Sequence, residues 1–467
     1  MAYADLTLAN IARWTGGRWT GTPEQLPRRL GGVSTDSRTA GSDDLFVALK
    51  GERFDGHDYV RPFLAAGGAA AMVAESWREA QSRDLDTARL IVLPDPLKGL
   101  QSAAAHYRDT FSLPVIAVTG SVGKTSTKEA IHAVLSQRFR VLRNAKSYNN
   151  HIGVPLTLLA LRDEHEILVT ELGTNHYGEL DLLGSLVKPA MAMITNIGFA
   201  HLEFFNDLAG VARAKFEIFN HCQPDGLALY NADDPILRNR NYPLTRTFSY
   251  GLEHPADLRA EILGCDEEAC YSLRLLGQEI KLPVSGRHHV GNSLAAAAVG
   301  VQFALKPEEI AAGLAALTAV DQRMALLRCG GVVLMNDTYN ANPGSCAAAL
   351  QTLADFALPG QGRRFAILGD MLELGSYSTD EHRKLADLAA GLHIDALWLY
   401  GHETIATLER AGEVGLAARH FAAKPELEEA LHAAIQPGDV LLFKGSRGMR
   451  METLVAAAQR HLTNHSK

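Results

Sequence analysis

The chain of 467 residues is longer than one hydrophobic core usually supports, so we expect two to four domains. An apolar fraction of 47% with 21% charged residues is typical of a soluble globular protein, and a net charge of −8 argues against a nucleic-acid-binding protein. The five cysteines are odd in number and form no C-x-x-C pair, which disfavours disulfides and zinc and indicates the cytoplasm.

Residues 1–93 are expected to form a small mixed α/β domain. Leu8, Ile11 and Ala12 predict an amphipathic helix ended by Gly16-Gly17, and residues 45–49 predict a strand. The turn containing Ser34, Asp36, Ser37 and Arg38 carries hydroxyl and guanidinium groups of the kind that bind phosphate. The same residue types also form helix caps and solvated turns, so this signal alone leaves both interpretations open.

A strand, a glycine loop and a helix follow in the next segment. Pro94-Asp95-Pro96 is interpreted as a linker and residues 99–107 as a helix. Residues 115–118 are β-branched and apolar, which predicts a buried strand. An apolar face at helical spacing, on residues 130–135, then predicts a helix after the loop.

The glycine loop predicts a phosphate-binding site. Counted from Gly120 it is shorter than the common G-x-x-x-x-G-K-[ST] pattern, but its chemistry is the same. Gly120 and Gly123 let backbone N–H groups turn toward an anion, and the helix N-terminus adds its positive dipole end. Lys124 is placed to reach the terminal phosphates of a nucleotide, and the Thr125 hydroxyl to reach Mg²⁺. The residues expected at the phosphates are Thr119, Gly120, Ser121, Val122, Gly123, Lys124, Thr125 and Ser126.

Strands alternate with helices through residue 318, which predicts a central domain with a mainly parallel sheet over residues 94–318. Polar residues follow these strands, at the edge where open α/β sheets bind ligands. Glu171 ends one strand, and His201 lies five residues beyond the end of another. Both are candidates for holding or orienting a metal ion. Taken singly, His201 is better interpreted as a structural surface histidine and Lys215 as part of a solvated helix face.

Residues 319–467 predict a second doubly wound α/β unit, with expected strands at 332–336, 365–369, 396–400 and 440–443. Three polar clusters follow its strands, and we expect them to share one face. They are residues 337–343, residues 369–371 and residues 444–447.

The combined motifs resemble the Mur ligases of peptidoglycan synthesis over nearly the whole chain. The P-loop indicates only a nucleotide-binding protein, whereas the stretches Tyr-Asn-Ala-Asn-Pro and Gly-Asp-Met-Leu-Glu-Leu-Gly are more specific. The motifs that carry the resemblance include Asp36-Ser37-Arg38, Asp55-Gly56-His57, Ser147-Tyr148-Asn149-Asn150, Glu171-Leu172-Gly173, residues 198–202, residues 214–219, Arg323-Met324, residues 337–343, residues 369–375 and residues 444–447.

The resemblance implies three domains: a UDP-sugar-binding domain, a P-loop ATPase and a C-terminal Rossmann-like domain. It implies that Thr125, Glu171, His201 and a carbamylated Lys215 hold Mg²⁺, with two ions bound. It further implies that Asn292, Arg323 and Asp337 contact adenine, phosphate and ribose of ATP. Ser34, Asp36, Ser37 and Arg38 would contact the UDP-sugar, and Asn340, Asn342 and Ser446 the incoming dipeptide.

The implied reaction adds D-alanyl-D-alanine to UDP-MurNAc-tripeptide through an acyl phosphate, with Lys124, Lys215, His201 and Glu171 as the catalytic set. Alternatives are a diamino-acid-adding Mur ligase, for which an arginine is expected where Gly344 follows Pro343, or a folylpolyglutamate synthase. A P-loop nucleotide switch is the alternative from another class. We expect small-molecule substrates only, a monomer, and neither nucleic-acid nor membrane partners.

Overall fold

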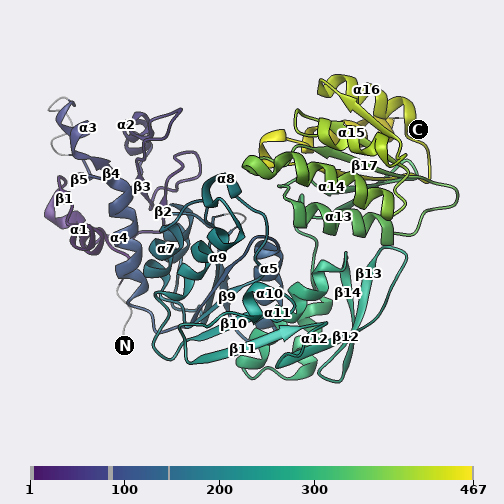
Figure 1. Cartoon of the computed structure of the whole chain (residues 1–467). Coiled ribbons are helices and arrows are strands. Elements are labelled where there is room, and N and C mark those ends of the chain that lie inside the picture. Colours follow the sequence, from purple (N-terminus) through teal and green to yellow (C-terminus); the bar gives the residue numbers. More distant parts are fainter. Residues whose placement is uncertain (1–4, 82–87, 146–147, 465–467) are drawn as a thin grey trace.

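The computed structural model describes residues 5–81, 88–145 and 148–464 and contains three sheets, each covered by helices. In Figure 1 the N-terminal sheet lies at upper left, the central sheet below, and the C-terminal sheet at upper right. This confirms the predicted α/β class with three sheet-containing units. Ser147, the first residue of one motif, lies outside the described residues. None of the described helices is both long and apolar enough to cross a bilayer.

The N-terminal sheet has five strands in the order β1-β5-β4-β3-β2, and only β1 runs antiparallel to its neighbour. The predicted first helix is confirmed, because Gly16 ends it with a left-handed φ of 66°. The strands are β1 Arg18–Trp19, β2 Val33–Ser34, β3 Leu45–Val47, β4 Ala70–Ala74 and β5 Leu90–Leu93, and the helices are α1 Leu8–Thr15, α2 Val60–Ala65 and α3 Glu75–Glu79.

The central sheet has nine strands in the order β14-β13-β12-β11-β10-β9-β6-β8-β7. The strands from β7 to β12 run parallel, whereas β12, β13 and β14 pair antiparallel. The bounds are β6 Val115–Thr119, β7 Val141–Arg143, β8 Ile167–Glu171, β9 Met191–Ile194, β10 Leu227–Asn231, β11 Arg246–Gly251, β12 Leu258–Cys265, β13 Cys270–Leu275 and β14 Gln278–Ser285.

The position of β6 explains both its composition and its role. Val115 and Ala117 pack into one hydrophobic core, while Ile116 and Val118 pack into another on the opposite face of the sheet. A strand buried on both faces needs apolar residues at every position, which explains the apolar run from which a buried strand was predicted. Because β6 lies between β8 and β9, the loop that follows it opens where the strand order reverses, which is the usual ligand position in such sheets.

The helices around the central sheet correct one prediction. Pro94-Asp95-Pro96 is not a linker throughout, because Asp95 caps helix α4 by accepting hydrogen bonds from the Leu97 and Lys98 amides, and Pro96 is its first residue. The helices are α4 Pro96–Arg108, α5 Lys124–Leu135, α6 Gly153–Leu159, α7 Glu179–Val187, α8 Leu202–Phe205, α9 Leu208–Phe216, α10 Pro235–Arg238, α11 His288–Gln302 and α12 Pro307–Ala315.

The C-terminal sheet has six strands in the order β15-β16-β20-β17-β18-β19, parallel except for the β15–β16 pair. Its polar clusters follow β16, β17 and β20, three adjacent strands, and therefore share one edge. The strands are β15 Ala325–Cys329, β16 Val332–Asp337, β17 Arg364–Gly369, β18 Ala396–Tyr400, β19 Ala418–Phe421 and β20 Val440–Lys444. The helices are α13 Pro343–Asp355, α14 Ser378–Gly391, α15 Ile405–Glu413, α16 Lys424–Ala434 and α17 Glu452–Asn464.

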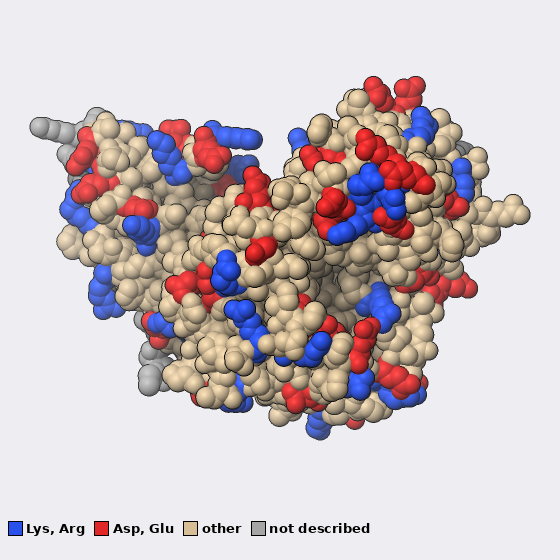
Figure 2. Space-filling model, in the orientation of Figure 1, with Lys and Arg blue, Asp and Glu red and all other residues tan. Residues whose placement is uncertain are grey.

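Figure 2 shows a deep notch between the N-terminal and C-terminal units, with the central unit forming its floor. Lysine, arginine, aspartate and glutamate are intermixed over this face, without an extended basic patch. The mixture of charges on this face agrees with the modest net charge of −8.

Candidate functional site

The loop between β6 and α5 has the backbone geometry of an anion-binding loop. Gly120 has φ 150° and Gly123, the N-cap of α5, has φ 84°. A Cβ on Gly120 would lie 1.9 Å from Thr195 Oγ1, and one on Gly123 would lie 2.8 Å from Asn292 Oδ1. Both glycines are therefore required by backbone conformation and by the close approach of neighbouring side chains.

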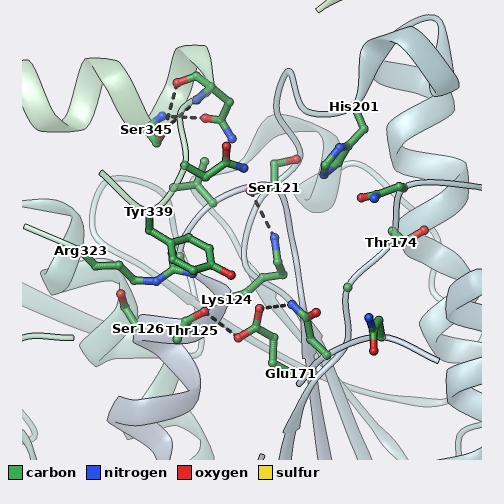
Figure 3. A pocket seen from close by; sticks show the side chains of 18 of the residues that line it. Ser121, Lys124, Thr125, Ser126, Glu171, Thr174, His201, Arg323, Tyr339 and Ser345 are labelled. Carbon is green, nitrogen blue, oxygen red and sulfur yellow. Dashed lines mark hydrogen bonds between the residues drawn. The ribbon is translucent and has the colours of Figure 1, made fainter. Parts of the chain in front are cut away.

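Lys124 begins helix α5 and lines the cavity above the loop (Figure 3). Its Nζ donates a hydrogen bond to the Gly120 carbonyl oxygen at 2.8 Å. Burial lowers the pKa of Lys124, while the nearby charge of Glu171 opposes this effect. The ammonium group of Lys124 is thus held by a backbone oxygen. A bound phosphate group can replace this oxygen as the hydrogen-bond acceptor.

Glu171, at the end of β8, is a buried carboxylate whose two oxygens have neutral partners. Thr125 Oγ1 donates to Oε2 and Asn149 Nδ2 donates to Oε1, both at 2.7 Å, and Figure 3 draws these bonds beside Lys124. The Glu171 amide donates to Asn144 Oδ1 at 2.9 Å, which fixes the strand end. The pairing of a carboxylate with a hydroxyl provides the oxygen ligands that Mg²⁺ prefers.

A cavity of about 490 Å³ joins this loop to the C-terminal unit. It brings together most of the predicted residues from two units that are distant in sequence. Those lining it are Ser121, Val122, Gly123, Lys124, Thr125, Ser126, Glu171 and His201 from the central unit and Arg323, Asp337, Asn340 and Asn342 from the C-terminal unit.

A second cavity of about 360 Å³ lies on the other side of the loop and shares Val122 and Gly123 with the first. Asn292 from α11 lines it, and the buried Asn292 Nδ2 has no hydrogen-bond partner among the described residues. A buried polar group without a partner is costly, so this cavity fits a polar, planar ligand group such as a nucleobase. Thr119 ends β6 and Gly120 begins the loop, and neither residue lines either cavity.

The C-terminal side of the first cavity is built around an ion pair between a buried lysine and a partly buried aspartate. Lys444 Nζ lies 2.5 Å from Asp337 Oδ2 and also donates to the Asn340 carbonyl oxygen at 3.0 Å. The Arg323 guanidinium stacks on the Tyr339 ring at 4.1 Å (Figure 3). Arg323 therefore enters the cavity from the segment that connects the central and C-terminal units.

Three predicted residues have structural partners that sequence could not show. Asn342 caps α13 by accepting from the Ser345 amide at 2.9 Å, and Asn340 Oδ1 accepts from the Arg447 amide at 3.2 Å. Ser446 is buried outside the cavity, and its hydroxyl accepts from the Leu372 amide at 2.8 Å. The Ser446 hydroxyl thus holds the loop after β17.

Lys215, at the end of α9, is 1% exposed and does not line the cavity. Burial, reinforced by the positive charge of Lys124, lowers its pKa well below the usual range. No hydrogen bond or ion pair of Nζ is found among the described residues. Lys215 is therefore a buried amine for which the charged form is unfavourable.

His201 caps the short helix α8 and points toward the cavity (Figure 3). Its Nδ1 lies 2.5 Å from Glu373 Oε2 of the C-terminal unit. This hydrogen bond is the main cause of a lowered pKa of Glu373, so the carboxylate stays ionised. Within the described residues no group of three or more His, Cys, Asp or Glu side chains could hold a metal ion. A metal here would therefore depend on Glu171, Thr125 and His201 together with ligand oxygens and water.

The N-terminal cluster lies apart from both cavities. The Arg38 guanidinium donates to both carboxylate oxygens of Asp36, and these hydrogen bonds lower the pKa of Asp36 to about 2. The Ser34 hydroxyl caps the same turn by accepting from the Asp36 amide. Ser37 lines a separate cavity of about 270 Å³ with Tyr59.

Comparison with known proteins assigns the family. A model of the Mur ligase family catalytic domain matches residues 29–108, the Mur ligase middle domain matches residues 118–300, and the Mur ligase glutamate ligase domain matches residues 322–447. The chain is 36% identical over 452 residues to the UDP-N-acetylmuramoyl-tripeptide–D-alanyl-D-alanine ligase of Bacillus subtilis, covering 96% of this chain and 97% of that protein. The chain belongs to the Mur ligase family.

Further relatives support the same family assignment. The enzyme of the same name from Escherichia coli is 38% identical over 445 residues, covering 93% of this chain and 95% of its own. A crystal structure of MurF from Acinetobacter baumannii superposes with a TM-score of 0.85 at 34% identity, over 98% of this chain and all of the other. MurF ligase from Thermotoga maritima in complex with ADP gives a TM-score of 0.79 at 27% identity, over 93% and 98%.

Sequence reasoning assigned no role to several residues of the site in this Mur ligase. Asn149 was recognised as part of a motif, but its hydrogen bond to Glu171 could not be anticipated from spacing. Glu373 lies in the Gly-Asp-Met-Leu-Glu-Leu-Gly stretch and Tyr339 in the Tyr-Asn-Ala-Asn-Pro stretch, while Asn144 lies just before the motif of residues 147–150. Their position in or beside a motif was the only sequence signal for these residues. Their hydrogen-bond or stacking partners lie on other elements, so the sequence could not identify them.

Proposed function

We propose that this Mur ligase joins D-alanyl-D-alanine to the free carboxylate of UDP-MurNAc-tripeptide and converts ATP to ADP and phosphate. The observation that carries the proposal is the cavity lined by both the P-loop and the strand ends of the C-terminal unit. Relatives with this activity in their names match over almost the whole chain. A nucleotide switch would not need the strand ends of a second unit to line its nucleotide site.

The chemistry of the reaction explains why the P-loop and the strand ends of the C-terminal unit must line the same cavity. A carboxylate is a poor acyl donor, because oxide would have to leave. Transfer of the γ-phosphoryl group to the tripeptide carboxylate gives an acyl phosphate, from which phosphate leaves when the dipeptide amine attacks. The protein contributes positioning and charge stabilisation to both steps. Lys124 stabilises the charge on the moving phosphoryl group, and the helix N-terminus of α5 adds its dipole.

The residues present fit a magnesium nucleotide. Thr125 and Glu171 supply oxygen ligands, His201 points into the same cavity, and Asn292 has an unpartnered amide in the adjoining one. When bound, Mg²⁺ offsets the negative charge of the phosphates. We assign Asn292 to adenine, while Arg323 and Asp337 would contact phosphate and ribose respectively.

We further propose that Lys215 is carbamylated and acts as a metal ligand. Burial lowers the pKa of Lys215 and so favours its neutral amine, which is the form that adds carbon dioxide. The product is an anion that attracts Mg²⁺, where an ammonium group would repel it. Incubation with ¹³C-bicarbonate should give a carbamate carbon signal that is absent from Lys215→Met. A carbamate signal of equal intensity in both proteins would contradict this assignment.

We assign one substrate to each unit: the UDP-sugar to residues 1–93, ATP to residues 94–318 and the dipeptide to residues 319–467. The UDP-sugar contacts are assigned to Ser34, Asp36, Ser37 and Arg38, and the dipeptide contacts to Asn340, Asn342 and Ser446. Because the Ser446 hydroxyl is already engaged, its contribution would be to hold the Leu372 loop. ATP and UDP-sugars are made in the cytoplasm, so these substrates support a cytoplasmic location. The monomeric state stays a prediction.

A phosphate-release assay tests the substrate pair. UDP-MurNAc-tripeptide containing either diaminopimelate or lysine is supplied with ATP and Mg²⁺, and D-alanyl-D-alanine is compared with single amino acids and glutamate. We expect phosphate release to require an acceptor and to be fastest with the dipeptide. Faster ligation of a single amino acid would refute the dipeptide assignment, and acceptor-independent phosphate release would favour a nucleotide switch.

A further inference from the structure

The segment from Phe199 to Phe205 of the central unit touches the C-terminal unit beside the cavity. Besides the His201–Glu373 hydrogen bond, the Glu203 amide donates to the Glu373 carbonyl oxygen at 3.1 Å. The Phe199 and Tyr377 rings lie 5.7 Å apart. In Figure 1 helix α8 is correspondingly the part of the central unit that reaches up beside α14 and its neighbouring loops. The metal-site histidine is thus part of an interdomain contact.

The backbone is strained on both sides of this contact. His201 has φ 55° and Glu373 has φ 65°, values in the left-handed region that residues with a Cβ seldom adopt. Such conformations cost free energy and persist where surrounding contacts impose them. Two facing side chains, each on a strained residue, indicate that their orientation is specifically maintained.

The loop that carries Glu373 is fixed within the C-terminal unit. The Leu372 amide donates to Ser446 Oγ at 2.8 Å, and the Met371 amide donates to His382 Nε2 at 3.0 Å. His382 is fully buried. A rigid loop places the Glu373 carboxylate at a defined point relative to β17 and β20, so its position reports where the whole C-terminal unit lies.

The chemistry of the contact determines which ring nitrogen of His201 stays available. An ionised carboxylate only accepts hydrogen bonds, so Nδ1 of His201 must carry the proton it donates to Glu373. In the neutral imidazole Nε2 then has a free lone pair. Carboxylates commonly fix metal-binding histidines in this way, and removing such a partner typically costs about 10–100-fold in metal affinity.

We propose that Glu373 is a positioning residue that orients His201 for the metal and thereby couples metal affinity to closure of the C-terminal unit. The inference rests on the metal role of His201 in the proposed function. The carboxylate reaches His201 only when the two units are in contact, so separation of the units removes it. Docking of the C-terminal unit and metal binding therefore stabilise each other.

Mn²⁺ binding without turnover tests this inference. Electron paramagnetic resonance measures Mn²⁺ affinity for the full chain with β,γ-methylene-ATP. We expect Glu373→Ala to weaken Mn²⁺ binding about tenfold. Glu373→Gln should retain most of the affinity, because its amide oxygen still accepts from Nδ1. Glu203→Gln is the matched control, since it removes a nearby exposed carboxylate without a hydrogen bond to another described side chain, and should leave affinity unchanged.

A double variant separates this inference from the metal role of His201. His201→Ala should itself weaken Mn²⁺ binding, and adding Glu373→Ala to it should have no further effect. If His201→Ala leaves the affinity unchanged, the metal role of His201 and the inference both fail. If His201→Ala weakens binding but Glu373→Ala does not, or if the two losses add fully, the inference alone is overturned.

A measurement without metal tests whether Glu373 affects the docking of the C-terminal unit. Small-angle scattering of the full chain reports how far the C-terminal unit lies from the central one. We expect Glu373→Ala to increase the radius of gyration without nucleotide or metal, because an interdomain hydrogen bond is lost. Glu373→Gln should lie close to the parent protein. Equal scattering curves for all three proteins would contradict the coupling to closure.

Discussion

Replacing Lys124 with alanine removes the positive charge closest to the expected γ-phosphate position. At present Nζ donates to the Gly120 carbonyl oxygen at 2.8 Å and lines the cavity that the phosphates would enter. Two unit charges about 4 Å apart interact by about 4 kcal/mol at an effective dielectric constant of about 20. We take this stabilisation to act mainly in the transition state. Each tenfold change in rate corresponds to about 1.4 kcal/mol, so losing about 4 kcal/mol should lower turnover about 10³-fold.

The assay is phosphate release at saturating substrates, with thermal unfolding as the check on folding. The pKa of Lys124 is already lowered by burial, so its removal relieves a cost of desolvation and should leave the melting temperature equal or higher. Lys98→Ala, on an exposed face of α4, is the matched control and should keep full activity. A folded Lys124→Ala protein with a near-normal rate would refute the phosphate-binding role of this loop.

Three further predictions concern motion, stability and pH. Adding β,γ-methylene-ATP with UDP-MurNAc-tripeptide should reduce the radius of gyration, because the C-terminal unit is expected to rotate about a hinge near residues 320–323; identical scattering curves would argue against closure. Lys444→Met should lower the free energy of unfolding by about 3 kcal/mol in denaturant titration, because it leaves the Asp337 carboxylate without its buried partner, and a further Asp337→Asn change should recover part of the loss. Burial, together with the positive charge of Arg143, lowers the pKa of His132 to about 4. As the pH falls from about 6.5 to 4, His132 therefore binds a proton in the unfolded chain but not in the folded one. Stability should therefore decline over that window, and His132→Gln should decline less; parallel curves would contradict this assignment.

Local sequence determined the individual elements of the phosphate-binding site. Residues 115–118 predicted a buried strand, and the structure places alternate residues in two different cores. Gly120 and Gly123 were expected to allow an unusual backbone turn in the loop, and they have φ values of 150° and 84°. These features depend on backbone sterics and on hydrophobic periodicity, which act between residues near in sequence.

Some of the fold was beyond such reasoning. The three antiparallel strands β12, β13 and β14 that extend the central sheet were not predicted as separate strands. Asp95 and Pro96 were interpreted as a linker, although they begin α4. Proline and aspartate favour both turns and helix starts, so only the chain that follows and the surface it packs against decide between them.

Only the tertiary structure decided which polar residues act together. Glu171 is held by Asn149, which the chain places 22 residues earlier, and His201 meets Glu373 from a different unit, 172 residues later. Ser446 follows a strand just as Asn340 does, yet its hydroxyl is buried beneath the Leu372 loop while Asn340 lines the cavity. A sequence pattern places a residue at a strand end, but the direction and partners of its side chain depend on how separate sheets pack against one another, because hydrogen bonds between distant elements form only after their surfaces meet.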